Sequence, residues 1–116
     1  MQVADNCGVR QAKVIKNLGG SWRKSSSLGD FVVIAVQKRD LNRKLVKKNI
    51  YLALIVGVRQ KVYRKLYGYH VQFANNRVVV LNDQGKMLGT RIKGPVCLEL
   101  RQRRLAKLVS VAKALV

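Results

Sequence analysis

The run Phe31–Val36 constrains the fold most, because it is rich in β-branched residues and apolar on both faces. A strand of this kind is expected in the wall of a barrel, where both of its faces are covered. Ile50–Val58 is a second long apolar run, and Gly57 within it predicts a bulge or a bend at a barrel corner. Together the two runs predict an all-β fold.

Shorter patterns predict the remaining strands. Val3–Arg10 indicates a short extended piece followed by a tight turn, and Arg10–Lys16 a strand with one basic, solvated face. Tyr69–Phe73 alternates between apolar and polar residues, Ala74–Asn76 indicates a turn, and Arg77–Leu81 returns. These last segments predict a hairpin.

The apolar period changes after Leu98. Leu105, Leu108 and Ala112 follow at helical spacings, which predicts two short helices broken around Arg103. The predicted fold is therefore a small closed five-stranded antiparallel barrel with short C-terminal helices. Residues 1–97 would form the barrel body and residues 98–116 a helical appendage of the same single domain.

Charge indicates the partner. The 116 residues carry 24 Lys and Arg against five Asp and Glu, a net charge of +19. Self-repulsion on this scale opposes compaction unless a polyanion neutralises it, so we expect a nucleic acid. A membrane is not expected, because the longest apolar runs are far shorter than the ~20 residues of a span.

The cations gather at strand ends. The densest patch lies in 38–48, and 59–65 forms a second basic loop. We expect phosphate contact at both, since clustered cations attract a polyanion. Trp22 beside Arg23 has two readings, stacking on a base or packing over one end of the barrel.

Catalytic and metal-binding chemistry is disfavoured. Cys7 and Cys97 lie ninety positions apart without a CxxC motif, and His70 stands alone. This spacing fits free, reduced thiols better than zinc ligands or a catalytic thiol. No matched nucleophile and base accompany them, so neither an enzyme nor a cofactor is predicted.

The stretch Leu88–Val96 contains two glycines and the only proline, so its backbone must follow a non-repetitive path. It would present Thr90, Arg91 and Lys93 on a stiff loop. Cations on such a loop can bind a phosphate backbone with little ordering cost.

Several segments resemble the fourteenth large-subunit ribosomal protein family. The matching segments occur in order along nearly the whole chain: Val-Ala-Asp-Asn-x-Gly-x-Arg at Val3–Arg10, Ile-Lys-x-Leu-Gly-Gly-Ser at Ile15–Ser21, Gly-Asp at Gly29–Asp30, Val-Lys-Lys at Val46–Lys48 and Gly-Thr-Arg-Ile-x-Gly-Pro-Val-x-x-Glu-Leu-Arg at Gly89–Arg101. Any one motif is weak, but five in register are specific.

The resemblance implies a structural protein of the large ribosomal subunit that binds large-subunit rRNA and contributes to inter-subunit bridges with small-subunit rRNA. Implied protein neighbours belong to the ribosomal families three and nineteen. A ribosomal silencing factor contacts family positions that correspond here to Thr90, Arg91 and Lys107.

Two sets of site residues follow. The expected RNA-binding residues are Arg10, Lys13, Arg23, Lys24, Arg43, Lys44, Lys47, Lys48, Arg59, Lys61, Arg64 and Lys65. The expected bridge and partner contacts are Thr90, Arg91, Arg101, Arg104 and Lys107.

The chain departs from the family pattern at a few positions. Asn49-Ile50 replaces a Gly-Asp turn, Lys93 replaces an apolar or aromatic residue, and the Pro-Asp-Gly hairpin tip is absent around Leu66–Tyr69. Such departures resemble organellar members and favour a mitochondrial ribosome over a bacterial or plastid one.

The alternative function is a free-standing, barrel-type nucleic-acid-binding regulator. It would need an aromatic platform on one sheet face, whereas the aromatic residues are scattered along this sequence. Tight, base-stacking binding to single-stranded oligonucleotides would favour it.

Overall fold

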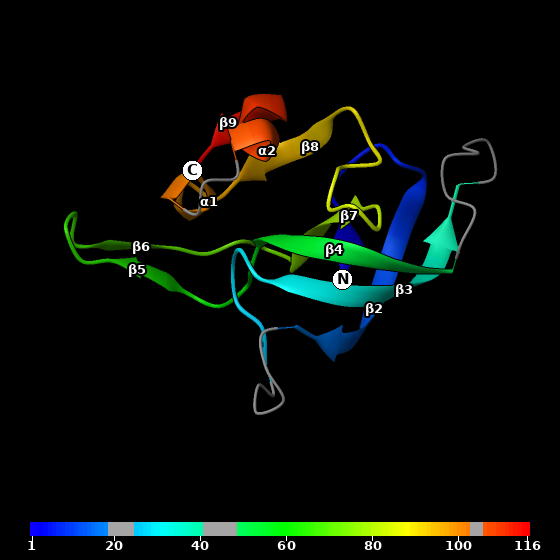
Figure 1. The fold of residues 1–116 in the computed structure, drawn as a ribbon. Helices are drawn as coiled ribbons and strands as arrows, with labels where there is room; N and C mark the ends of the chain where they lie inside the picture. Colours follow the sequence, from blue (N-terminus) through cyan, green and yellow to red (C-terminus); the bar gives the residue numbers. More distant parts are fainter. Residues whose placement is uncertain (19–24, 41–48, 103–105) are drawn as a thin grey trace.

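The computed structural model describes residues 1–18, 25–40, 49–102 and 106–116 (Figure 1). Its elements are β1 (Gln2–Val3), β2 (Val9–Asn17), β3 (Phe31–Arg39), β4 (Ile50–Gly57), β5 (Val62–Arg64), β6 (Tyr69–Val71), β7 (Arg77–Leu81), β8 (Ile92–Val96), α1 (Glu99–Gln102), α2 (Ala106–Val111) and β9 (Ala112–Leu115).

Strands β1, β2, β3, β4 and β7 close a barrel in that order. Consecutive pairs run antiparallel except β1 and β7, which pair in parallel with Val3 opposite Val78. Closure gives each wall strand a partner on both sides, although the two-residue strand β1 pairs with only a short part of β2 and β7.

The long apolar run of β4 is explained by two cores, one on each side of the wall. The burial of both faces predicted for Phe31–Val36 is wrong, because Phe31 is exposed and Val33 and Ala35 are only half-buried. In β4, Ala53 and Ile55 pack inside the barrel with Ile34, while Leu54 and Val56 pack on its outer side. The outer side is covered by β8, α1 and α2, which lie over the barrel in Figure 1. Because alternate residues of one strand face opposite sides, a strand buried on both must be apolar throughout. The predicted irregularity at Gly57 is confirmed by a register shift between β4 and β7.

The structure is the predicted all-β closed five-stranded barrel, but its wholly antiparallel pairing and its helical appendage were predicted wrongly. The β1–β7 pair is parallel, and the chain ends in β9, which pairs in parallel with β8. The helical segments span only four and six residues. The last residues form a strand rather than a helix because their backbone pairs with β8: the Val116 N–H donates to the Val96 carbonyl at 2.9 Å. A side-chain pattern cannot report that such a partner strand is available.

The predicted hairpin between Tyr69–Phe73 and Arg77–Leu81 is also wrong. β6 pairs with β5, with Tyr63 opposite His70, whereas β7 pairs with β4 and β1. The segment from 58 to 76 is thus the outer part of a long β4–β7 hairpin, and it projects away from the barrel (Figure 1).

Candidate nucleic-acid interface

Strand β2 carries a basic outer surface. Arg10, Lys13 and Lys16 are all exposed, although residues three apart in a regular strand point to opposite faces. The register of β2 against β3 shifts between Val9 and Gln11, between Gln11 and Ala12, and between Val14 and Lys16. The first and last shifts put an extra residue in β2 and reverse its alternation, so the three cations share the solvated side. The basic face predicted for 10–16 is therefore formed.

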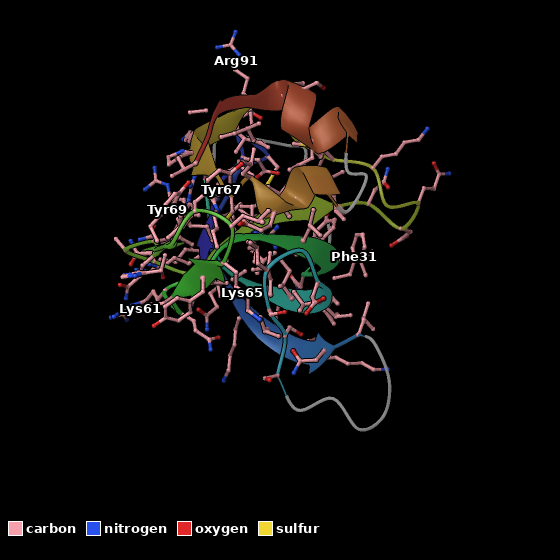
Figure 2. The ribbon with its side chains drawn as sticks, turned by 90° about the vertical axis from the view of Figure 1, so that its left-hand side faces the viewer. Phe31, Lys61, Lys65, Tyr67, Tyr69 and Arg91 are labelled. Atoms are coloured by element: carbon pink, nitrogen blue, oxygen red, sulfur yellow. The ribbon has the colours of Figure 1, made fainter. Side chains whose placement is uncertain are left out.

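A second group of cations lies on the projecting hairpin. Arg59, Lys61 and Lys65 are exposed, and Figure 2 labels Lys61 and Lys65 on the hairpin. The backbone N–H of Arg59 donates to the Asn76 side-chain oxygen at 2.9 Å. This hydrogen bond connects the outgoing and returning segments at the base of the hairpin.

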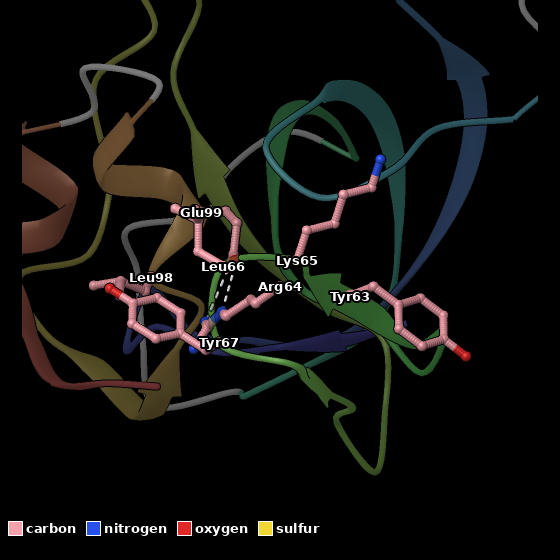
Figure 3. Close-up of a pocket in the computed structure, with 7 residues that line it drawn as sticks. All are labelled: Tyr63, Arg64, Lys65, Leu66, Tyr67, Leu98 and Glu99. Carbon is pink, nitrogen blue, oxygen red and sulfur yellow. Dashed lines mark hydrogen bonds and ion pairs between the residues drawn. The ribbon is translucent and has the colours of Figure 1, made fainter.

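Arg64 is buried rather than directed to solvent. Only 8 % of its side chain is exposed, and its Nε and Nη2 donate to the two Glu99 carboxylate oxygens at 2.6 and 3.1 Å (Figure 3). It also donates to the Tyr69 hydroxyl at 3.1 Å and to the Val116 carbonyl. These contacts occupy the guanidinium, so we assign Arg64 a structural role and leave it out of the proposed RNA contacts.

The Arg64–Glu99 pair sets the local electrostatics. Hydrogen bonds from Arg64 lower the pKa of Glu99 to about 2, and the same bonds raise the pKa of Arg64. The Cys97 thiol donates to Glu99 at 2.6 Å, and burial raises the pKa of that thiol. Burial also raises the pKa of the Cys7 thiol to about 12. Both cysteines are free and buried, as the sequence predicts for unpaired thiols.

Asn6 organises the loop that carries Thr90 and Arg91. Its Oδ1 accepts the backbone N–H groups of Thr90 at 2.8 Å and Arg91 at 3.1 Å, and its Nδ2 donates to the Thr90 hydroxyl at 3.1 Å. Gly89 permits this approach, since a Cβ there would lie 2.7 Å from the Asn6 Oδ1. Thr90 and Arg91 are consequently exposed on a loop with a defined path, and Arg91 projects from the molecule in Figure 2.

Arg77 fixes the next part of the same loop. Its guanidinium donates to the backbone carbonyls of Lys93 and Pro95, and burial lowers its pKa. Gly94 between them has a φ of 74°, which favours glycine. Lys93 is exposed at this turn.

Several predicted contacts lie outside the described residues. These are Arg23, Lys24, Arg43, Lys44, Lys47, Lys48 and Arg104, and the side chains of Arg101 and Lys107 are not described either. Both alternatives for Trp22 also fall outside this part of the chain.

Sequence reasoning missed two features. It treated the aromatic residues as scattered, whereas Tyr63, Tyr67 and Tyr69 gather on one hairpin with exposed fractions of 72 %, 69 % and 48 %. The alternation of cations with Tyr63 was the available signal. It also missed Asn6, for which no local pattern exists, because its partners lie 84 and 85 residues away.

Among the described residues, no group of three or more His, Cys, Asp or Glu side chains could hold a metal ion. No described helix is long and apolar enough to cross a membrane.

The fold and this surface define a small, strongly basic β-barrel protein whose exposed cations suit a polyanion. The family model for ribosomal protein L14p/L23e matches residues 1–116. The chain belongs to this family, which confirms the resemblance of its sequence motifs.

Known relatives agree with this result. The chain is 40 % identical over 113 residues to the large ribosomal subunit protein uL14 of Mesomycoplasma hyopneumoniae strain 7448, and the match covers 97 % of this chain and 92 % of the relative. The uL14 proteins of strains J and 232 of the same organism show the same identity and coverage.

Proposed function

We propose that this chain is a structural constituent of the large ribosomal subunit and binds ribosomal RNA through cations on its barrel and hairpin. The whole-length family match carries the proposal. The described surface supports it, because Arg10, Lys13, Lys61 and Lys65 are exposed on two separate elements. We assign the chain no enzymatic activity, since the family consists of ribosomal proteins.

The mechanism is electrostatic. Cations on a rigid barrel neutralise RNA phosphates and let RNA segments approach each other. The exposed Arg59 belongs to the same proposed set, together with cations outside the described residues: Arg23, Lys24, Arg43, Lys44, Lys47 and Lys48.

We further propose that the Asn6-supported loop contacts partners at the subunit interface. Thr90 and Arg91 would contribute to bridges with small-subunit rRNA, together with Arg101, Arg104 and Lys107 of the C-terminal segment. Neighbouring proteins of the families three and nineteen, and a silencing factor at Thr90, Arg91 and Lys107, remain expectations from the resemblance. The exposure of Thr90 and Arg91 supports them.

For the compartment we propose a mitochondrial ribosome, on the residue departures from the family pattern. The uL14 relatives from Mesomycoplasma hyopneumoniae are bacterial proteins and favour the alternative. Fractionation of organelles from the source cells, with detection of this chain, would decide it.

Two measurements test the proposed function. In a sedimentation gradient of cell or organelle extract, the chain should co-migrate with large ribosomal particles, and recovery only in the free fraction would contradict the proposal. For the isolated protein, the logarithm of the RNA association constant should fall against log salt with a slope of about −4 or steeper, if each of five exposed cations neutralises one phosphate. A nearly flat response would contradict the electrostatic mechanism.

One observation bears on the alternative regulator. Exposed aromatic residues gather on the hairpin, while Phe31 is the one exposed aromatic side chain on the described barrel strands. A regulator with a base-stacking platform on a barrel face is therefore not supported by the described residues.

A further inference from the structure

We propose that one face of the β5–β6 hairpin binds an unpaired RNA nucleotide, with the base stacked on Tyr63 and the flanking phosphates contacted by Lys61 and Lys65. This inference rests on the proposed function, because it takes RNA as the partner. It adds the class of RNA that the hairpin selects, namely unpaired rather than double-stranded segments.

Two cations lie close to Tyr63 in the sequence. Lys61 and Lys65 stand two positions before and after it, just outside the three-residue strand β5, and both are exposed. Continued alternation along the ribbon would direct them to the Tyr63 side. Directly opposite residues of an antiparallel pair also share a face, and His70 lies opposite Tyr63. The two ring centroids are 5.6 Å apart with planes tilted by 55°. The result is an aromatic surface between two cations.

The Tyr63 ring is both exposed and supported. It is 72 % exposed, which leaves most of the ring accessible to a base. The neighbouring residue Arg64 anchors the hairpin to Glu99, and its carbonyl accepts the N–H groups of Tyr67 at 3.1 Å and Gly68 at 3.0 Å. A ring presented on an anchored hairpin loses little conformational freedom when a ligand binds.

The charge around this face selects a polyanion. No acidic residue lies between Asp40 and Asp83 in the sequence. Glu99, which lies beside the hairpin, is neutralised by Arg64. An unpaired nucleotide offers both a phosphate and an open base face, whereas the stacked bases of a duplex offer only their edges and phosphates.

The opposite face is less suited to this role. Figure 3 shows Tyr63 and Tyr67 pointing to opposite sides of the hairpin. Tyr67 packs near Tyr69, with ring centroids 5.8 Å apart, and the Tyr69 ring lies against the Arg64 guanidinium at 5.6 Å. Tyr67 and Tyr63 both line a pocket that also includes Leu98 and Glu99. Tyr67 is therefore a matched control, since it is exposed on the same hairpin.

The experiment compares two RNAs with the full-length protein. One is a stem-loop with 2-aminopurine in a loop of unpaired purines, and the other is a fully paired duplex of equal length. For the wild type we expect tighter binding to the stem-loop and a change of 2-aminopurine fluorescence on binding. Tyr63→Leu should weaken stem-loop binding about tenfold and leave duplex binding unchanged, because stacking on one aromatic ring is lost.

The controls separate stacking from charge and from folding. Tyr63→Phe should keep stem-loop binding, Tyr67→Leu should leave both RNAs unaffected, and Lys61→Gln with Lys65→Gln should weaken both. Thermal unfolding of Tyr63→Leu should match the wild type, since the side chain is exposed.

Each remaining outcome overturns the inference in a distinct way. Equal stem-loop affinity of Tyr63→Leu and wild type would exclude stacking on this ring while leaving salt-dependent RNA binding intact. Loss with Tyr67→Leu instead would place the base on the other face. Failure of the wild type to bind either RNA would contradict the proposed function itself, and with it this inference.

Discussion

Arg64 on the projecting hairpin and Glu99 at the start of α1 form an ion pair with two hydrogen bonds, at 2.6 and 3.1 Å. The pair connects residues 35 positions apart. With the Arg64 bond to the Val116 carbonyl, it ties the hairpin to the C-terminal segment that covers the outer core. The orientation of the hairpin therefore depends on one buried guanidinium.

Removing the Glu99 charge should destabilise the protein. We expect Glu99→Gln to lower the free energy of unfolding by about 2 kcal/mol, because the buried Arg64 loses charge-assisted hydrogen bonds. Urea denaturation monitored by circular dichroism measures this change. Arg59→Gln is the matched control, since Arg59 is exposed and should give a change close to zero. Equal effects of the two substitutions would argue against a structural role of the pair.

The same pair predicts a loss of stability in acid. The pKa of Glu99 is about 2 in the folded protein against an ordinary value of 4.5. A carboxylate with a lowered folded pKa stabilises the fold above its unfolded pKa, and this contribution is lost as the pH falls from about 4.5 to about 2.

Urea unfolding at several pH values, compared between wild type and Glu99→Gln, isolates this contribution. The difference in stability between the two proteins should shrink across that window. The comparison is needed because burial raises the pKa of Asp5, which acts in the opposite direction. A difference that stays constant from pH 6 to pH 2 would contradict the assignment to Glu99.

Asn6 should matter for the Thr90 loop. Asn6→Ala removes three hydrogen bonds to Thr90 and Arg91, and we expect it to cost about 1–2 kcal/mol and to increase amide hydrogen exchange at both residues. Hydrogen exchange followed by mass spectrometry checks this. The β2 region around Lys13 serves as an internal reference and should exchange as in the wild type.

Gly89→Ala tests the close approach itself. The new Cβ would lie 2.7 Å from the Asn6 Oδ1 and 3.1 Å from the Asp5 Cβ, so we expect about 1–3 kcal/mol of destabilisation. Combined with Asn6→Ala, the loss should be smaller than the sum of the single losses, because one of the clashing groups has gone. Strict additivity in thermal or urea unfolding would contradict the contact.

Gly57 has an analogous role at the hairpin base. A Cβ there would lie 2.6 Å from the Phe73 ring, so Gly57→Ala should cost about 1–3 kcal/mol. Phe73→Leu should relieve part of this cost in the double variant, as measured by urea unfolding. A Gly57→Ala protein as stable as the wild type would show that Phe73 moves freely.

Much of the barrel could be predicted from local patterns. The runs at 31–36 and 50–58 indicate strands buried on both faces; both form barrel strands, but only β4 packs against both cores, whereas β3 buries one face. The basic surface of β2 was also predictable, although its bulges were not. The pairing of β7 with β4 and β1 was missed, because Tyr69–Val71 has an equally good strand pattern and strand pairing is not encoded in the period of a single strand.

The candidate interface also has features that the sequence predicts and features that only the folded structure reveals. Exposed cations such as Lys61 and Lys65 follow from composition and position, whereas the burial of Arg64 does not, because an arginine in a basic run is indistinguishable from its neighbours until Glu99 is brought beside it. The gathering of Tyr63, Tyr67 and Tyr69 on one hairpin was not predicted either, because Tyr69–Phe73 was expected to pair with Arg77–Leu81 and not with β5.

The amino-acid order alone determined an apolar wall of strands, a large positive charge and membership in a ribosomal protein family. These properties depend on residue type and short-range spacing, which can be read directly from the sequence. The tertiary structure decided which cations reach solvent, which strand closes the barrel, and how Asn6 and Glu99 fix loops more than thirty residues away. Those outcomes depend on long-range packing and on competition between backbone partners, which only the folded chain resolves.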